Sequence, residues 1–514
     1  MERTLPKSVD YLDTLPKGVP SERKRRKFYP ANGTQYQLGG SIIIEVSDPR
    51  HFLDPTNSYL NFTMQNTSGQ TLGLDYGGGS VFIRNLRLQQ AGNTIMNIEN
   101  YNRLVCAVIQ PAVNPVHMSA QKSITDNTIF ASSIAGVPDA VNTVVGSDFA
   151  GSTYNPDDNM ADGDTQTFSV PLIGGLFSQS KLIPLPLLRE PIQIVIDLET
   201  NGERIGCFGA APVAATFFTL SNVTYTAELI DVPRDVLGYL RTVQEQNGGS
   251  LLVQAQSYAH TTGLLPAGST GEQIVNIPIR RKSIKSILFV GQGNVASTTT
   301  AFSDVAQMVP CGEFSVYNLS QSANFLLNNY QIKAGSMVFP PTPVNGPGGR
   351  GDVGGEVSVA TLPDAQFARG EALTEVSKAF GHLGTAMGQG LLSVLTYGPF
   401  KLNDNVNADQ EVVPGADFVF VLAGGGGDNG AVRLRDVVPF AAMECTPFAL
   451  DMEAFQNEAV NSGIDTETLS LDMNMVLNIA NGTGAQLEQV NLDFWTWHDV
   501  IYYFNSDGTI TFSQ

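Results

Sequence analysis

Residues 469–479, which read LSLDMNMVLNI, carry the clearest structural signal in the chain. Apolar side chains occupy every odd position from Leu469 to Ile479, whereas most even positions hold Ser, Asp or Asn. Because successive side chains of a β-strand point to opposite faces of its sheet, this period of two predicts a strand with one buried face.

The same alternation recurs along the chain, with turn-forming residues between the alternating stretches. It is present at 60–65, 192–199 and 251–256, and a long aromatic stretch at 490–504 contains both tryptophans. Charged residues make up only 15% of the 514 residues, while Gly (51) and Pro (28) are frequent, a balance that favours strands joined by turns over exposed helices. The sequence therefore predicts an all-β chain.

One helical segment interrupts this pattern. After Pro233, four apolar residues between Val236 and Val243 follow helical spacing, and Asn247-Gly248-Gly249 is a typical helix end. Strand-like alternation then begins again. We expect two tandem eight-stranded jelly-roll β-sandwiches with short helices and long inserted loops. The predicted parts are an N-terminal arm (1–35), a first jelly roll (36–232), a linker helix (233–249) and a second jelly roll (250–514).

The charge balance limits the possible partners. The chain has 29 basic and 49 acidic residues, a net charge of −20, which repels nucleic acid and anionic membranes over most of the surface. No apolar run approaches the ~18 residues that a membrane span requires, so we do not expect an integral membrane protein. The exception to the acidic character is one dense basic cluster in the arm, formed by Arg23, Lys24, Arg25, Arg26 and Lys27.

Three interpretations of this basic cluster remain open. It is a solvated tail, a nuclear-import signal, or an arm that faces inward and contacts packaged nucleic acid, an inner layer or a neighbouring subunit.

The familiar catalytic motifs are missing from the sequence. It contains no GxxxxGK[ST] phosphate loop, no HExxH helix and no GxSxG elbow. Histidines occur singly, without the local pairs that metal sites and catalytic dyads usually show. We therefore expect a protein that is not an enzyme, with no catalytic, cofactor-binding or metal-binding residues and no cofactor. The five histidines are His51, His117, His260, His382 and His498.

Three weaker patterns suggest binding or catalysis. The acids at Asp157, Asp158, Asp162 and Asp164 invite a calcium interpretation, but Met160 stands where an EF-hand loop needs an oxygen ligand. The neighbouring acids Asp197 and Glu199 are a candidate pair for glycoside hydrolysis, although acids are numerous enough for chance pairs. Arg350-Gly351-Asp352, in a Gly/Pro-rich loop, matches an adhesion tripeptide that such surroundings also produce by coincidence.

Three segments resemble the double jelly-roll major capsid proteins of polintons, polinton-like viruses and virophages. The first is 36–66, with Phe52-Leu53-Asp54-Pro55 and Ser58-Tyr59-Leu60-Asn61-Phe62, extended by 84–101. The second runs from Phe168 through Pro171 and Gly174-Gly175 to Leu185. The third runs from Ser462 to the turn at Asp507-Gly508-Thr509.

This resemblance implies a mechanical function. It implies a homotrimer that forms a pseudo-hexameric capsomer, and capsomers that tile the icosahedral shell of a DNA virus. The implied partners are other copies of the chain, neighbouring capsomers, and penton and minor capsid proteins. The implied location is the virion, after assembly inside the host cell.

Two alternatives stay open. One is a carbohydrate-binding or glycoside-hydrolysing β-sandwich, which would expose aromatic side chains such as Trp495 and Trp497 beside paired acids. The other is a minor capsid or spike protein, for which a single barrel would be the usual form.

Overall fold

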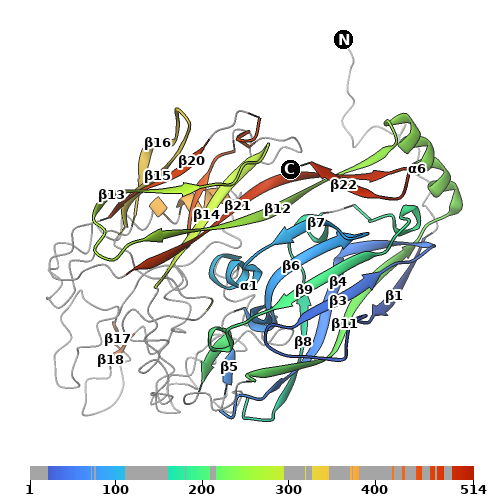
Figure 1. Ribbon diagram of the computed structural model, residues 1–514, viewed down its shortest axis with the longest axis horizontal. Helices are drawn as coiled ribbons and strands as arrows, with labels where there is room; N and C mark the ends of the chain where they lie inside the picture. The colour runs from blue at the N-terminus through green and yellow to red at the C-terminus, as the bar shows by residue number, and fades with distance from the viewer. Residues whose placement is uncertain are drawn as a thin grey trace.

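Two β-sandwiches make up most of the described part of the chain (Figure 1). The computed structural model describes residues 21–70, 72–74, 77–109, 160–179, 181–208, 216–293, 319, 327–346, 371–372, 374–380, 419–421, 431–433, 447–453, 463–468, 472–479 and 489–513.

The first sandwich consists of two antiparallel four-stranded sheets. One sheet has the order β1 (Glu22–Phe28), β11 (Phe218–Asp231), β4 (His51–Asn66) and β8 (Thr165–Pro171). The facing sheet has the order β3 (Ser41–Val46), β9 (Ile192–Leu198), β6 (Ile83–Gln90) and β7 (Asn93–Ile98). Short strands add to this framework: β2 (Gln35–Tyr36) pairs with β11, and β5 (Leu72–Leu74) pairs with β10 (Gly206–Phe208).

The second sandwich has the same construction. One sheet runs β12 (Ser250–Leu265), β21 (Val490–Asn505), β14 (Ile284–Gly293) and β19 (Phe448–Asp451), and β22 (Ile510–Ser513) also pairs with β21. The other runs β13 (Gly271–Ile277), β20 (Met473–Ile479), β15 (Leu327–Ala334) and β16 (Met337–Asn345). Strands β17 (Val419–Val421) and β18 (Ala431–Arg433) pair only with each other among the described strands.

Strand order is identical in the two sandwiches. When the eight principal strands of each are counted along the chain, one sheet has the order first, eighth, third, sixth, and the other second, seventh, fourth, fifth. This is the jelly-roll order, in which the first strand pairs with the last. The predicted fold class, two tandem jelly rolls, is confirmed.

Each jelly roll has an aromatic centre. In the first, Phe82 lies 4.8 to 6.0 Å, between ring centroids, from Phe62, Phe168 and Phe218. In the second, the ring of Phe289 lies 5.2 to 5.7 Å from three other rings, which are those of Tyr330, Phe448 and Phe494. Each such buried side chain contributes about 1.5–3 kcal/mol through its removal from water.

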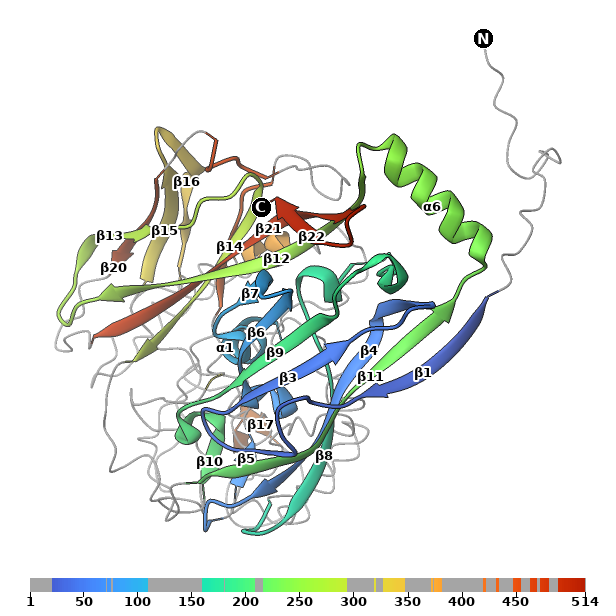
Figure 2. The ribbon, with the colours of Figure 1, turned by 45° about the vertical axis from the view of Figure 1, so that its right-hand side comes forward.

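The helix that the sequence predicts after Pro233 is present. Helix α6 (Arg234–Gln246) follows Pro233 and joins β11 to β12 at one end of the molecule (Figure 2). Helix α1 (Tyr101–Leu104) continues into a π-helical turn, η2 (Val105–Ile109). The strand predicted at 469–479 is β20, from Met473 onward; residues 469–471 lie outside the described residues.

The prediction of an N-terminal arm separate from the first jelly roll is wrong for residues 22–28. These residues form β1, the first of the eight strands of the first jelly roll, and pair with β11 from Glu22↔Asp231 to Phe28↔Tyr225. This strand cannot be recognised from hydrophobic alternation, because six of its seven residues are exposed and it has no row of apolar side chains. Backbone pairing to a neighbour specifies it instead.

Candidate functional site: the interface between the jelly rolls

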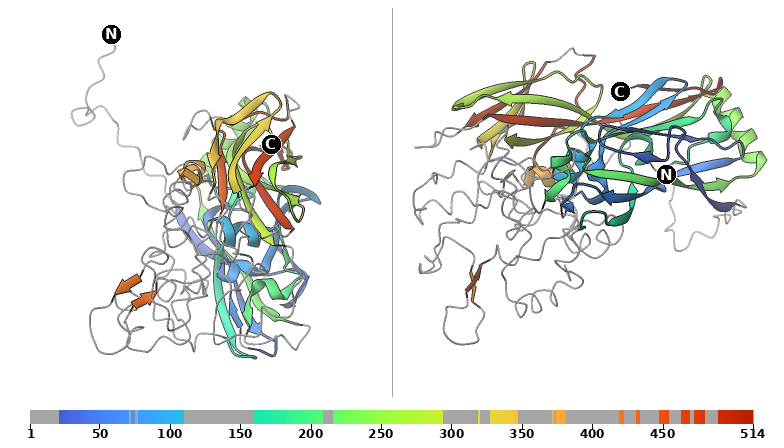
Figure 3. Two further views of the ribbon diagram at one scale, coloured as in Figure 1. Left: turned by 90° about the vertical axis from the view of Figure 1, so that its left-hand side faces the viewer. Right: turned by 60° about the horizontal axis from the view of Figure 1, so that its bottom comes forward.

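The two jelly rolls share one continuous apolar core. Strand β12 of the second roll contacts β7 and the short helix η5 (Gly175–Phe177) of the first (Figures 1 and 3). The approach requires glycine at position 175, where a Cβ atom would lie 2.8 Å from Tyr502 Oη of the second roll. A Cβ atom on Gly174 would lie 2.4 Å from Ile98 Cδ1 of the first roll itself. Both glycines also have positive φ angles, of 98° and 53°, which other residues rarely adopt.

A fully buried arginine connects the rolls at this interface. Arg103, on α1 of the first roll, donates from Nη1 to the carbonyl oxygen of Leu319 (2.5 Å) and from Nη2 to that of Gly291 (3.2 Å). Its Nε lies 3.5 Å from Asp493 Oδ2 on β21. Because an unpaired buried charge is very unfavourable, these three partners fix Arg103 and the position of β21 relative to α1.

Asp493 is the centre of a second group of contacts. His260 Nε2, on β12, lies 2.9 Å from Asp493 Oδ1, and Asn100 Nδ2 of the first roll lies 3.3 Å from the same ring nitrogen. Burial alone would raise the pKa of Asp493, but the hydrogen bond with His260 and the charge of Arg103 hold the pKa below its ordinary value. The interface therefore holds a carboxylate that is charged at neutral pH.

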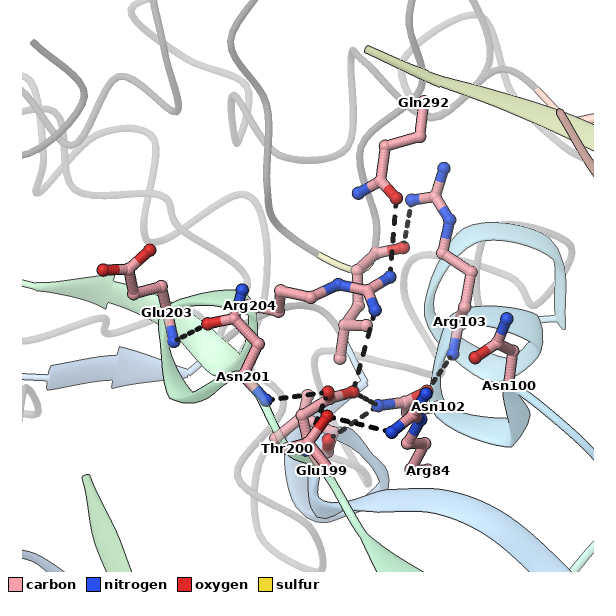
Figure 4. Close-up of polar contacts among 12 residues, drawn as sticks. Arg84, Asn100, Asn102, Arg103, Glu199, Thr200, Asn201, Glu203, Arg204 and Gln292 are labelled. Atoms are coloured by element: carbon pink, nitrogen blue, oxygen red, sulfur yellow. Dashed lines mark hydrogen bonds and ion pairs between the residues drawn. The ribbon is translucent and has the colours of Figure 1, made fainter. Parts of the chain in front are cut away.

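Glu199 organises the polar side of the interface (Figure 4). Its side chain is 1% exposed. Oε1 accepts hydrogen bonds from the backbone N–H groups of Thr200 (2.9 Å) and Asn201 (3.0 Å), and Oε2 accepts from Asn102 Nδ2 (2.6 Å). Arg204 Nη1 lies 3.9 Å from Oε2, and Arg204 Nη2 donates to Oε1 of Gln292 in the second roll (3.4 Å). Glu199 thus orients α1, and Arg204 connects it to Gln292 on β14.

The last turn of the chain forms a third contact between the rolls. Gln90 Oε1 on β6 accepts from the N–H of Ile510 (2.6 Å), and Gln90 Nε2 donates to the carbonyl oxygen of Gly508 (3.0 Å). The N–H of Arg189 donates to the same carbonyl oxygen (3.1 Å). The turn between β21 and β22 is therefore bound to the first roll through Gly508 and Ile510.

The basic cluster lies in β1, and ion pairs within the chain occupy most of it. Arg23 Nε lies 2.9 Å from Glu228 Oε2 on β11, and Arg25 Nε lies 3.5 Å from the other oxygen of the same carboxylate. Arg26 Nη1 lies 3.0 Å from Asp48, which follows β3 of the facing sheet. The cluster therefore closes one edge of the sandwich, while its three arginines remain 53–56% exposed.

The two acids proposed for glycoside hydrolysis have separate structural partners. Asp197 receives Arg87 Nη2 at 2.8 Å on each oxygen, and Glu199 is held in the interface described above. Trp495, proposed as a surface aromatic, is 0% exposed. These positions do not form an open sugar-binding groove.

The structure describes only part of the two other predicted binding patterns, the acidic cluster and the Arg-Gly-Asp tripeptide. Asp162 and Asp164 accept hydrogen bonds from the backbone N–H groups of Gly69 and Ala161, and Asp157, Asp158 and Arg350-Gly351-Asp352 lie outside the described residues. In the described ranges, no group of three or more His, Cys, Asp and Glu residues is arranged to hold a metal ion. Within the same part of the chain, no helix is both long enough and apolar enough to span a bilayer.

Sequence reasoning missed the residues that connect the rolls. Arg103 and Asp493 are the charged residues of two mostly apolar segments, Tyr101–Ile109 and Val490–Phe494. A charge inside a segment predicted to be buried is the available signal, because buried charges need a partner. The partner itself cannot be deduced from spacing, since the two residues lie in different rolls.

Comparison with known proteins identifies the fold. No family model and no curated protein sequence matches the chain. Among solved structures, it is similar to PBCV-1 VP54 fitted into a cryo-EM reconstruction of the virophage Sputnik, with a TM-score of 0.55, 9% identity and 98% of each chain covered. It is also similar to a chain of the quasi-atomic model of the PBCV-1 virus capsid, with a TM-score of 0.53, 9% identity and 98% of each chain covered. The fold implied by the resemblance to capsid proteins is thereby confirmed.

Proposed function

We propose that this chain is a capsid protein, a structural subunit that trimerises into pseudo-hexameric capsomers of an icosahedral viral shell. The observation that carries the proposal is the identical strand order of the two jelly rolls. Three copies of a chain with two similar units present six similar units around one axis, which gives a nearly hexagonal outline that can tile a surface. The fold likeness to the PBCV-1 chains, over 98% of the length, supports this function.

The rigid interface between the rolls also supports the proposal. A shell subunit has to keep the angle between its two units constant, because a change in that angle would disturb every neighbouring contact. Arg103, Asp493 and Gln90 connect the rolls through buried contacts that would fix this angle. Within the proposal, the units are 22–231 and 250–513, α6 is the connection between them, and the location is the virion.

The proposal assigns β1 to the wall of the first roll. A contact between this basic strand and packaged nucleic acid would have to compete with Glu228 and Asp48 for the same arginines. We therefore propose that the cluster acts mainly in closing the sandwich, and that neighbouring copies and other capsid proteins are the principal partners.

Mass photometry combined with negative-stain imaging of the purified chain tests this function. The expected result is trimers with hexagonal outlines. Stable monomers that hydrolyse members of a glycan panel would overturn the proposal in favour of a glycoside-hydrolysing β-sandwich.

A further inference from the structure

A lysine and two carboxyl groups meet in a buried position on the second jelly roll. Lys285 lies on β14, Asp499 on the neighbouring strand β21, and Glu453 just beyond the end of β19. Strands β14 and β21 lie side by side (Figure 1). Their side chains are 6%, 1% and 11% exposed. Lys285 Nζ lies 2.8 Å from Glu453 Oε1 and 3.7 Å from Asp499 Oδ1.

An irregularity in the sheet brings the lysine to this position. The pairing of β14 with β21 shifts between Ile284 and Ser286, so Lys285 is the residue that bulges out of register. Bulges of this kind redirect a side chain and are frequent beside functional groups. Regular pairing would have aligned Lys285 with a single residue of β21.

The carboxyl group of Asp499 is held in place on its other side. Ser283 Oγ donates to Asp499 Oδ2 (2.7 Å), and the N–H of Asp499 donates to the carbonyl oxygen of Ser283 (3.0 Å). This leaves Oδ1 as the oxygen that faces the lysine. The amine and the carboxyl carbon are therefore held close together before any reaction, which is the main requirement for an intramolecular reaction.

The surroundings favour the uncharged form of the Asp499 carboxyl group. The ring of Trp497 lies 6.0 Å from Lys285 Nζ. Burial raises the pKa of the Asp499 carboxyl, against the opposing effects of the Ser283 hydrogen bond and the Lys285 charge, and the nearby Glu453 raises it further. A neutral carboxylic acid reacts with an amine far more readily than a carboxylate does.

We propose that Lys285 and Asp499 form an intramolecular amide bond between their side chains, with Glu453 as the catalytic residue that carries protons. Nothing in this inference depends on the capsid function proposed above. It assigns a covalent modification to a site whose three residues all belong to the second jelly roll.

The reaction consumes no oxidant and no co-reactant. The ammonium group of Lys285 gives one proton to Glu453, and the freed amine forms a bond from Nζ to Cγ of the protonated Asp499 carboxyl. The Cγ–OH bond then breaks, the hydroxyl takes the proton held by Glu453, and water leaves. The nitrogen finally loses a second proton, which balances the one that Asp499 took up from solvent to become neutral. Burial keeps bulk water from reversing the step.

The bond would join two adjacent strands far apart in sequence. A cross-link between β14 and β21 restricts the unfolded chain and stabilises the folded one, as a disulfide does, but without depending on redox conditions. It would also replace a buried charged pair, which is costly to desolvate, by a neutral amide.

Intact-mass measurement of the denatured full-length protein tests the proposal. The wild-type protein should be lighter than its sequence mass by one water molecule, and a protease digest should contain a branched peptide that joins Lys285 to Asp499. Asp499→Asn should lose ammonia instead of water, since the amine then displaces an amide nitrogen. Glu453→Gln should fold, as judged by circular dichroism, but retain its full mass.

A control and two contrary outcomes complete the test. Lys378→Met removes another ion-paired lysine, whose Nζ lies 2.7 Å from Glu375 Oε1 but whose side chain is 31% exposed, and it should leave the mass deficit intact. Full mass in the wild-type protein, with unmodified Lys285 and Asp499 peptides, would overturn the cross-link. A mass deficit that persists in Glu453→Gln would overturn the role of Glu453.

Discussion

Replacing Arg103 by methionine is the most direct test of how the two jelly rolls are held together. The change keeps a side chain of similar length but removes the donors to Leu319 and Gly291 and the charge beside Asp493. Removing one member of a buried pair typically costs about 3–5 kcal/mol, because the remaining charge and carbonyl groups stay buried without partners. We expect Arg103→Met to lower the free energy of unfolding by about that amount.

Urea denaturation followed by tryptophan fluorescence measures this effect. Trp495 is a suitable reporter because its ring lies 5.2 Å from that of His260 at the interface. The matched control is Arg87→Met, which breaks the ion pair between Arg87 and Asp197. This pair has two contacts of 2.8 Å, but the Arg87 side chain is 33% exposed. Partly exposed pairs contribute about 0.2–1 kcal/mol. If the two variants unfold at the same urea concentration, the interface does not depend on Arg103 and our reasoning is refuted.

Three further changes test other parts of the structure. Gly508→Ala should lower the free energy of unfolding by at least about 1–3 kcal/mol, because Gly508 has a φ of 83° and the new Cβ would lie 2.6 Å from the backbone nitrogen of Arg189. Gly268 has a similar φ of 76° but no atom within 4 Å of a new Cβ, so Gly268→Ala should lower the melting temperature less. Phe289→Ala should lower the free energy of unfolding by about 3–5 kcal/mol in urea titrations. A smaller loss of stability than that caused by replacing an exposed apolar residue with alanine would contradict the central position of Phe289. Burial, and then Arg281, lowers the pKa of His498 from 6.5 to about 4. The neutral form of His498 therefore contributes to the free energy of unfolding fully above pH 6.5, and this contribution is lost as the pH falls through about 4. The loss amounts to about 3 kcal/mol, and His498→Asn should abolish it when stability is measured as a function of pH.

The alternation of apolar residues predicted the fold well because burial of one sheet face is a local property. β20 shows it clearly, since all five of its apolar residues are buried and both of its asparagines are only half-buried. The helix α6 was predictable for a similar reason, because Pro233 and the glycines at its end act on the backbone next to them.

The strand β1 and the contacts between the rolls were not predictable in this way. β1 owes its place to pairing with β11, about two hundred residues further along the chain, and its side chains are basic and exposed. Arg103 and Asp493 meet only because the rolls pack against each other. Such contacts depend on the three-dimensional arrangement, which hydrophobic periodicity does not encode.

The pairing of β1 with β11 has a consequence for synthesis of the protein. During translation, residues 22–28 emerge early but have no partner until residues 218–231 have followed. Non-local pairing of this kind slows folding and leaves strands open to aggregation. A strand that carries five positive charges repels other copies of itself until it pairs. Part of this charge is neutralised when Glu228 and Asp48 form ion pairs with its arginines.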